Sequence, residues 1–153
     1  MIQQTSVPSE FKSREEYREH LRQQVLKARV PVHVGLIMDG NGRWAKERGY
    51  SRIRGHQMGA RSIKRLVRFA DKLGVKHISL YVFSSENWSR PRLEVVGLMK
   101  LIRAYVIRER DELHAEGVRF RHLGRREELP SGLAQDLDIA EKLTEKLTAP
   151  ITK

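Results

Sequence analysis

The stretch VHVGLIMDGNGRW, residues 32–44, decides the fold. Its first seven residues form a short apolar run preceded by Pro31, and such a run is typical of a buried strand. The run ends abruptly at Asp39, and glycines follow at positions 40 and 42. The sequence therefore predicts a strand over 32–38 that carries a polar, glycine-rich turn at its carboxyl end.

Helical and extended patterns alternate along the rest of the chain. We expect helices over 13–28, 55–74, 92–116 and 131–149, and further strands over 77–83 and 118–123. Ser13 can cap the first helix, and Gly74 and Gly117 stand where C-terminal caps are expected. Long helical crossovers between strands indicate an α/β fold with a mostly parallel central sheet flanked by helices.

The chain has 153 residues, the usual size of one compact domain. We expect a flexible tail over 1–12 and a single domain over 13–153. The absence of cysteine excludes disulfides and thiolate metal sites, and it suits a cytoplasmic protein. No signal-like segment is visible, and no apolar run approaches the roughly 20 residues of a membrane-spanning helix. Any membrane contact is therefore expected to be peripheral.

Lys and Arg outnumber Asp and Glu by 30 to 19, which gives a formal net charge of +11. Such a charge attracts nucleic acid, anionic membranes or phosphorylated small molecules. A nucleic-acid-binding module is therefore the alternative from another functional class. The basic residues are spread along the chain, and no helix-turn-helix, zinc-finger or RNP-like pattern is present. We expect no nucleic-acid partner.

The polar cluster after the first predicted strand has the residue types of an anion site. Gly40 and Gly42 let backbone N–H groups approach an anion, and Arg43 supplies a guanidinium fork for phosphate oxygens. Asp39 would repel a bare phosphate, so its place beside these groups indicates a bridging divalent cation, Mg²⁺. An ordinary turn explains the DG and NG dipeptides equally well.

A second polar cluster follows the strand predicted over 77–83. It contains Ser84, Ser85, Glu86, Asn87, Trp88 and Arg90. Ligands of parallel sheets bind beyond the carboxyl ends of the strands, so we expect this cluster and the first one to share one site. Arg52 and His56 lie near the start of the next helix, where cations are unfavourable unless an anion is bound. Solvated surface charge is the ordinary explanation for such residues.

Three stretches, HVGLIMDGNGRWAKERG, RIRGHQMGA and LYVFSSENWSRP, closely resemble the cis-prenyltransferase family in that order. The resemblance is to undecaprenyl diphosphate synthases in particular, and it extends loosely to about Thr148. It implies condensation of isopentenyl diphosphate with an allylic diphosphate such as farnesyl diphosphate, giving a polyprenyl diphosphate of the undecaprenyl type. It also implies Mg²⁺ as cofactor, a homodimer in the full-length family, and a role in supplying the lipid carrier for cell-wall synthesis.

The resemblance assigns roles to individual residues. Asp39 matches the family's essential aspartate, associated with Mg²⁺ and diphosphate departure. The residues that match the allylic diphosphate site are Gly40, Asn41, Gly42, Arg43, Trp44, Arg52 and His56. The second motif positions the reactants and has been linked to proton removal. Its matches are Ser84, Asn87, Trp88 and Arg90, with Ser85 and Glu86 between them. Asp39 and Asn87 are thus the candidate catalytic residues.

The resemblance also implies that part of the family pattern has no match in this chain, which ends at Lys153. Unmatched are a later Arg-x5-Arg-x-Ser motif for isopentenyl diphosphate and a later glutamate of the metal site. Three explanations are open: a truncated gene, a split enzyme completed by a second polypeptide, or a reduced protein with another role. We favour truncation after the third strand and its helix. We expect weak binding of allylic diphosphate and poor elongation by this chain alone.

The helix predicted over 92–116 has two interpretations. By resemblance, its apolar face would line a tunnel for the growing chain. The residues concerned are Val95, Leu98, Met99, Ile102 and Val106. Ordinary core packing is the alternative, and for each residue taken singly it is the stronger one.

Overall fold

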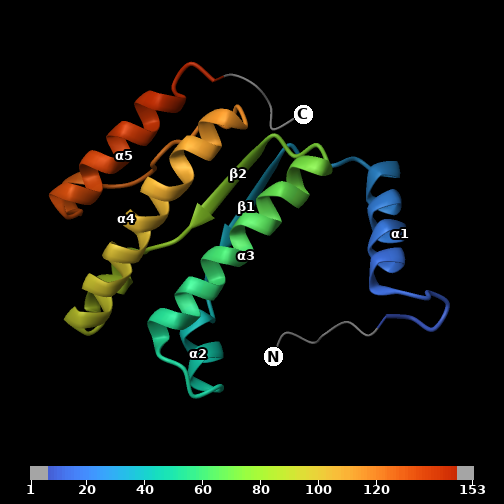
Figure 1. The fold of residues 1–153 in the computed structure, drawn as a ribbon, viewed down its shortest axis with the longest axis horizontal. Helices are drawn as coiled ribbons and strands as arrows, with labels where there is room; N and C mark the ends of the chain where they lie inside the picture. Colours follow the sequence, from blue (N-terminus) through green and yellow to red (C-terminus); the bar gives the residue numbers. More distant parts are fainter. Residues whose placement is uncertain (1–6, 148–153) are drawn as a thin grey trace.

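The structure, a computed structural model, describes residues 7–147 (Figure 1). Its helices are α1 (Arg14–Lys27), α2 (Asn41–Lys46), α3 (Arg52–Lys72), α4 (Arg92–Ala115) and α5 (Ser131–Thr144). Its strands are β1 (His33–Ile37) and β2 (His77–Tyr81), and short 3-10 helices cover η1 (Ser85–Ser89) and η2 (Arg126–Glu128). None of the described helices is long and apolar enough to cross a membrane.

The two strands are parallel neighbours, and α3 forms the crossover between them. Their register pairs His33 with His77 and Ile37 with Tyr81. Met38 N donates to Tyr81 O at 3.1 Å, so the pairing continues to the point where both polar clusters begin. A parallel pair needs a long crossover, which α3 supplies as it runs beside the sheet in Figure 1. The α/β fold with a parallel sheet flanked by helices is confirmed.

Several predicted helix boundaries are confirmed by capping geometry. Glu16 N donates to Ser13 Oγ at 3.1 Å, which makes Ser13 the N-cap of α1. Gly74 and Gly117 have φ angles of 84° and 73°, in the left-handed region where C-terminal caps favour glycine. The helix predicted to end near Ala149 ends at Thr144 instead. Residues 148–153 lie outside the described part of the chain, as do the first six residues of the expected tail.

Residues 118–123 are not a third strand, and that prediction is wrong. Within residues 7–147 the sheet consists of β1 and β2. The segment instead bonds to side chains of α5, where Phe120 N donates to Thr144 Oγ1 at 3.0 Å and His122 N to Glu141 Oε1 at 2.7 Å. Because these side chains accept its backbone donors, the segment follows α5 in an irregular course.

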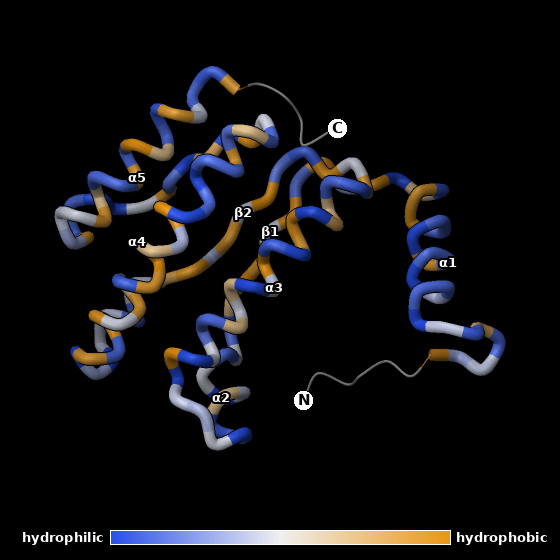
Figure 2. Tube along the Cα trace, viewed as in Figure 1, coloured by the Kyte–Doolittle hydropathy of each residue, from blue (hydrophilic) through white to orange (hydrophobic). Residues whose placement is uncertain are grey.

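The first strand is also more exposed than predicted. Exposed and half-buried residues alternate along β1, and Ile37 is 78% exposed. Tyr81, its partner in β2, is exposed as well. Figure 2 shows hydrophobic residues along β2. With two strands in the described sheet, each strand has an open edge, and the prediction of a buried first strand is wrong for this structure.

The main hydrophobic core lies between α4 and α5. Val95 and Met99 of α4 pack against Leu133 and Leu137 of α5, and all four side chains are buried. Partly buried residues around this cluster are Phe83, Ile102, Val106, Phe120 and Leu129. Of the α4 residues that the resemblance assigned to a tunnel, all except Leu98 therefore have a packing role in this core.

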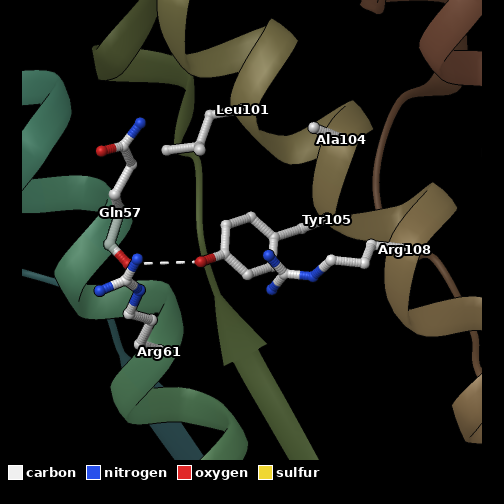
Figure 3. A pocket seen from close by; sticks show the side chains of 6 residues that line it. All are labelled: Gln57, Arg61, Leu101, Ala104, Tyr105 and Arg108. Carbon is white, nitrogen blue, oxygen red and sulfur yellow. Dashed lines mark hydrogen bonds between the residues drawn. The ribbon is translucent and has the colours of Figure 1, made fainter.

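Helices α3 and α4 meet along a largely polar seam. Tyr105 Oη donates to Gln57 O at 3.3 Å, and the two residues line a groove of about 270 Å³ between the helices (Figure 3). Farther along, Lys64 Nζ donates to Glu109 Oε2 at 2.9 Å and also pairs with Glu112. These contacts fix the spacing of the two helices whose first turns carry site residues.

Candidate functional site

The loop after β1 begins with an exposed ion pair. Asp39 Oδ1 accepts from Gly40 N at 2.6 Å, and Asp39 Oδ2 accepts from Arg43 Nη2 at 3.0 Å. Gly40 has a φ angle of 81°, a left-handed conformation that favours glycine. Both charged side chains are more than 70% exposed, at 74% for Asp39 and 77% for Arg43. An exposed pair of this kind is weakly held, so both groups are available to a ligand.

Helix α2 sits on α3 because two glycines leave room for Asn41. A Cβ at Gly55 would overlap Asn41 O, and a Cβ at Gly59 would lie 2.5 Å from Asn41 Oδ1. Gly42, next in α2, lies against Arg52 of α3, since a Cβ there would be 3.5 Å from Arg52 Nη1. The start of α2 and the start of α3 are thus fixed side by side. This contact joins the first polar cluster to Arg52.

The second cluster is shaped by its own side chains. Ser84 N donates to Asn87 Oδ1 at 3.2 Å, which closes the turn that opens η1. A hydrogen bond with Ser84 lowers the pKa of Glu86. Trp88 packs edge-on against Phe83, with ring centroids 5.0 Å apart. The amide oxygen of Asn87 therefore stabilises the turn in this structure.

Arg52 and the second cluster meet at Glu94, in the first turn of α4. Glu94 Oε1 accepts from Arg90 Nη1 at 3.0 Å and lies 3.7 Å from Arg52 Nη1. The Glu94 side chain is only 11% exposed. Arg52 comes from the start of α3 and Arg90 from the loop after β2, so this contact joins the two predicted halves of the site.

His56 belongs to the same cluster. Its Nε2 atom is buried and has no hydrogen-bond partner within the described residues. Burial lowers the pKa of His56, and the positive charge of Arg90 lowers it further. The imidazole is therefore neutral near pH 7, and its buried Nε2 atom is left without a hydrogen-bond partner among the described residues.

Trp44 contacts the turn between α2 and α3. The guanidinium carbon of Arg48 lies 4.7 Å from the Trp44 ring centroid, and the Tyr50 ring lies 6.1 Å away. In a second cation–π contact, the guanidinium carbon of Arg54 lies 4.1 Å from the Tyr50 ring centroid. These contacts give Trp44 a role in holding the turn that leads into Arg52.

Sequence reasoning missed three residues of this arrangement. Gly55 and Gly59 were not recognised as the seat of Asn41, although a spacing of four residues puts them on one helix face. Glu94 was not assigned a site role. Its four-residue spacing from Arg90 at the start of a helix was the available signal. Its approach to Arg52 depends on tertiary packing.

The described residues contain no group of three or more His, Asp or Glu side chains arranged to hold a metal ion. Mg²⁺ is commonly held by one or two carboxylates together with substrate phosphates. Asp39 is an exposed carboxylate at the carboxyl end of β1, next to Arg43. Asp39 could therefore supply one protein ligand to a magnesium ion.

Comparisons with known proteins show the family of this chain. The family model described as "Putative undecaprenyl diphosphate synthase" matches residues 37–152. Isoprenyl transferase 1 of Bradyrhizobium diazoefficiens is 50% identical over 113 residues, which cover 74% of this chain and 46% of that protein. Isoprenyl transferase of Clostridium perfringens is 51% identical over 100 residues, covering 65% of this chain and 40% of that protein.

A solved structure gives the same assignment. Lavandulyl diphosphate synthase from Lavandula x intermedia, in complex with dimethylallyl diphosphate, matches with a TM-score of 0.74 and 31% identity. The match covers 76% of this chain and 50% of that one. The chain thus spans about half the length of the relatives it matches. With its family model, its relatives and its fold in agreement, the chain belongs to the undecaprenyl diphosphate synthase family of cis-prenyltransferases.

Proposed function

We propose that this chain binds an allylic diphosphate, such as farnesyl diphosphate, at the carboxyl edge of its sheet, for condensation with isopentenyl diphosphate. The observation that carries the proposal is the meeting of Arg52 and Arg90 at Glu94. Guanidinium groups are well suited to phosphate oxygens because their planar fork donates two parallel hydrogen bonds. Arg43, exposed beside Asp39, adds a third guanidinium at the same edge.

The chemistry needs a stabilised leaving group. In the condensation the bond between C1 and oxygen of the allylic diphosphate breaks, and the diphosphate leaves with the electron pair. The double bond of isopentenyl diphosphate forms the new bond to C1, and loss of a proton completes the cis unit. Positive groups fixed beforehand around the departing oxygens lower the barrier to this step.

The proposed roles follow from the positions of the residues. Arg43, Arg52 and Arg90 bind the diphosphate, and neutral His56 contributes a ring nitrogen. Asp39 holds Mg²⁺, which neutralises diphosphate charge when bound. Asn87 and Ser84 shape the loop that orients the reactants. Gly40, Asn41 and Gly42 present the backbone of the first loop, with Trp44, Ser85, Glu86 and Trp88 around the site.

Binding and elongation are separate properties of this chain, which spans about half the length of its relatives. We propose that the 153-residue chain binds allylic diphosphate and elongates it poorly or not at all by itself. Elongation would then require the later motifs that the resemblance implies, whether in a longer form of the protein or in a second polypeptide. Homodimer formation and peripheral membrane association in the full-length family belong to the same proposal.

The test is thermal stabilisation of the chain by farnesyl diphosphate with and without Mg²⁺. We expect the wild type to be stabilised, and the shift to fall strongly in Asp39→Ala and Arg52→Ala. Arg18→Ala is the matched control, because it removes an exposed charge from α1, far from the site in Figure 1. A wild type that shows no shift contradicts the proposal.

Two further measurements define the activity. Radiolabelled isopentenyl diphosphate added with farnesyl diphosphate and Mg²⁺ reports elongation, and robust incorporation would contradict the proposed impairment. Binding of oligonucleotides with a steep salt dependence, and without competition by farnesyl diphosphate, would favour the nucleic-acid alternative instead.

A further inference from the structure

We infer that Glu94 is a positioning residue of the diphosphate site: its carboxylate holds Arg52 and Arg90, from two separate elements, around one point. This inference rests on the proposed function. A single oxygen, Oε1, lies 3.0 Å from Arg90 Nη1 and 3.7 Å from Arg52 Nη1. Both contacts are to arginines proposed to bind substrate, so Glu94 acts through them.

Close packing of α3 and α4 puts Glu94 in this position. A Cβ at Gly97 would lie 2.7 Å from Ile53 Cδ1, so the two helices approach closely at their first turns. Glu94 lies about one turn before Gly97 on α4, and Arg52 immediately precedes Ile53 on α3. The same glycine contact therefore brings the carboxylate to the arginine.

Electrostatics gives the carboxylate its function. Two guanidinium groups converging on one point repel each other, and the neighbouring His56 adds a half-buried ring that stays neutral. Glu94 is largely shielded from water, with 11% of its side chain exposed, so its attraction for both cations is screened less than that of a surface pair. It keeps the arginines converged before a diphosphate arrives, which lowers the ordering cost of binding.

A simpler role competes with this one. An acidic residue in the first turn of a helix interacts favourably with the helix dipole, and Glu94 occupies that place in α4. The two roles respond differently to one conservative change. Glu94→Asp keeps the negative charge at the helix start but withdraws the oxygen by one methylene, so only the positioning role predicts a loss. Glu94→Gln removes the charge and leaves a neutral oxygen, so both roles predict a loss.

The experiment measures binding of inorganic pyrophosphate and of farnesyl diphosphate, each with Mg²⁺, to the full 153-residue chain by calorimetry. We expect Glu94→Ala and Glu94→Asp to weaken both by about tenfold, the scale of one lost charge-assisted contact. Glu94→Gln should also weaken both, because it removes the charge that holds the two arginines together. Glu112→Ala is the control, because it removes a carboxylate that pairs two cations at the other end of the same helices.

The outcomes distinguish failure of the positioning role from failure of the proposed function. Wild-type binding that Glu94→Ala leaves unchanged refutes the positioning role alone. Wild-type affinity in Glu94→Asp, with loss in Glu94→Gln, assigns Glu94 to the helix dipole and also refutes it. If Glu94→Ala does not fold, the Asp variant still decides. Absence of pyrophosphate and farnesyl diphosphate binding by the wild type refutes the proposed function, and the inference with it.

Discussion

Asn41 and Gly59 are in direct contact across the interface of α2 and α3, where a Cβ on the glycine would lie 2.5 Å from Asn41 Oδ1. Asn41 is the first residue of α2 and directly follows Gly40 of the loop after β1. The glycine therefore determines how closely this loop approaches α3. The position of the first polar cluster therefore depends on the absence of a side chain at Gly59 of α3.

The first prediction concerns Gly59→Ala. The added methyl group has to displace the Asn41 side chain, and overpacking of this kind typically costs about 1–3 kcal/mol. We expect a lower free energy of unfolding in urea and weaker farnesyl diphosphate binding. Gly35→Ala is the control, because a Cβ at that position in β1 meets nothing within 4 Å. Equal urea midpoints for Gly59→Ala and wild type would show that the contact is not tight.

The second prediction concerns Thr144, which is fully buried. Its hydroxyl accepts from Phe120 N at 3.0 Å and donates to Ala140 O at 2.9 Å. Thr144→Val keeps the shape but leaves the half-buried Phe120 N–H without its partner, at a cost of about 1 kcal/mol. Thr144→Ser keeps the hydroxyl. Amide hydrogen exchange at Phe120 should accelerate in the valine variant and remain slow in the serine variant. Similar exchange in both would contradict this account.

The same hydroxyl explains the missed third strand. The first four residues of this segment, VRFR, alternate apolar and basic, and a two-residue period predicts which side chains share a face. The pattern does not reveal which group accepts the backbone hydrogen bonds. Here the acceptors are Thr144 and Glu141, about 20 residues farther along the chain. Local patterns were sufficient for the caps at Ser13 and Gly74, because those depend on neighbours in sequence.

The site divides in the same way. Asp39 and Arg43 were recognisable from sequence because they lie four residues apart in the short stretch that follows β1. The expectation that the two clusters share one edge followed from parallel topology alone, and the register of β1 and β2 supports it. Glu94 was missed because its contact with Arg52 exists only when α4 packs on α3. Sequence alone does not reveal that Glu94 lies close to Arg52, because the two residues belong to different helices.

The third prediction concerns the ion-pair network between α3 and α4. Glu112 pairs with Lys64 and with Arg68, whose Nη2 atom lies 2.6 Å from Glu112 Oε1. The three side chains are 34–57% exposed. Glu112→Gln should lower the melting temperature by a few degrees in low salt, since partly exposed networks contribute up to about 1 kcal/mol.

Salt dependence identifies the origin of this effect. The difference between Glu112→Gln and wild type should shrink in about 1 M NaCl, where the Debye length is about 3 Å. Asp111→Asn makes the same charge change on α4 at a side chain that is 78% exposed, and it should have little effect. A melting difference that persists unchanged in high salt would point to packing instead of charge.

The fourth prediction concerns pH and His56. Burial and then Arg90 lower the pKa of this imidazole below its usual value of 6.5, so below that pH the unfolded chain binds more protons than the folded one. The stability that depends on neutral His56 is therefore present above about pH 6.5 and is lost as the pH falls. His56→Gln removes this dependence, because an amide does not titrate.

Between pH 7.5 and 5.5, the loss of unfolding free energy should accordingly be smaller in His56→Gln than in wild type, by no more than about 1.4 kcal/mol. His20→Gln on α1 serves as the control, since His20 is exposed. Urea titrations at the two pH values provide the measurement. An equal loss of unfolding free energy in wild type and His56→Gln would contradict this prediction. It would mean that the folded protein protonates His56 as easily as the unfolded chain does, and that the ring is better hydrated than its burial indicates.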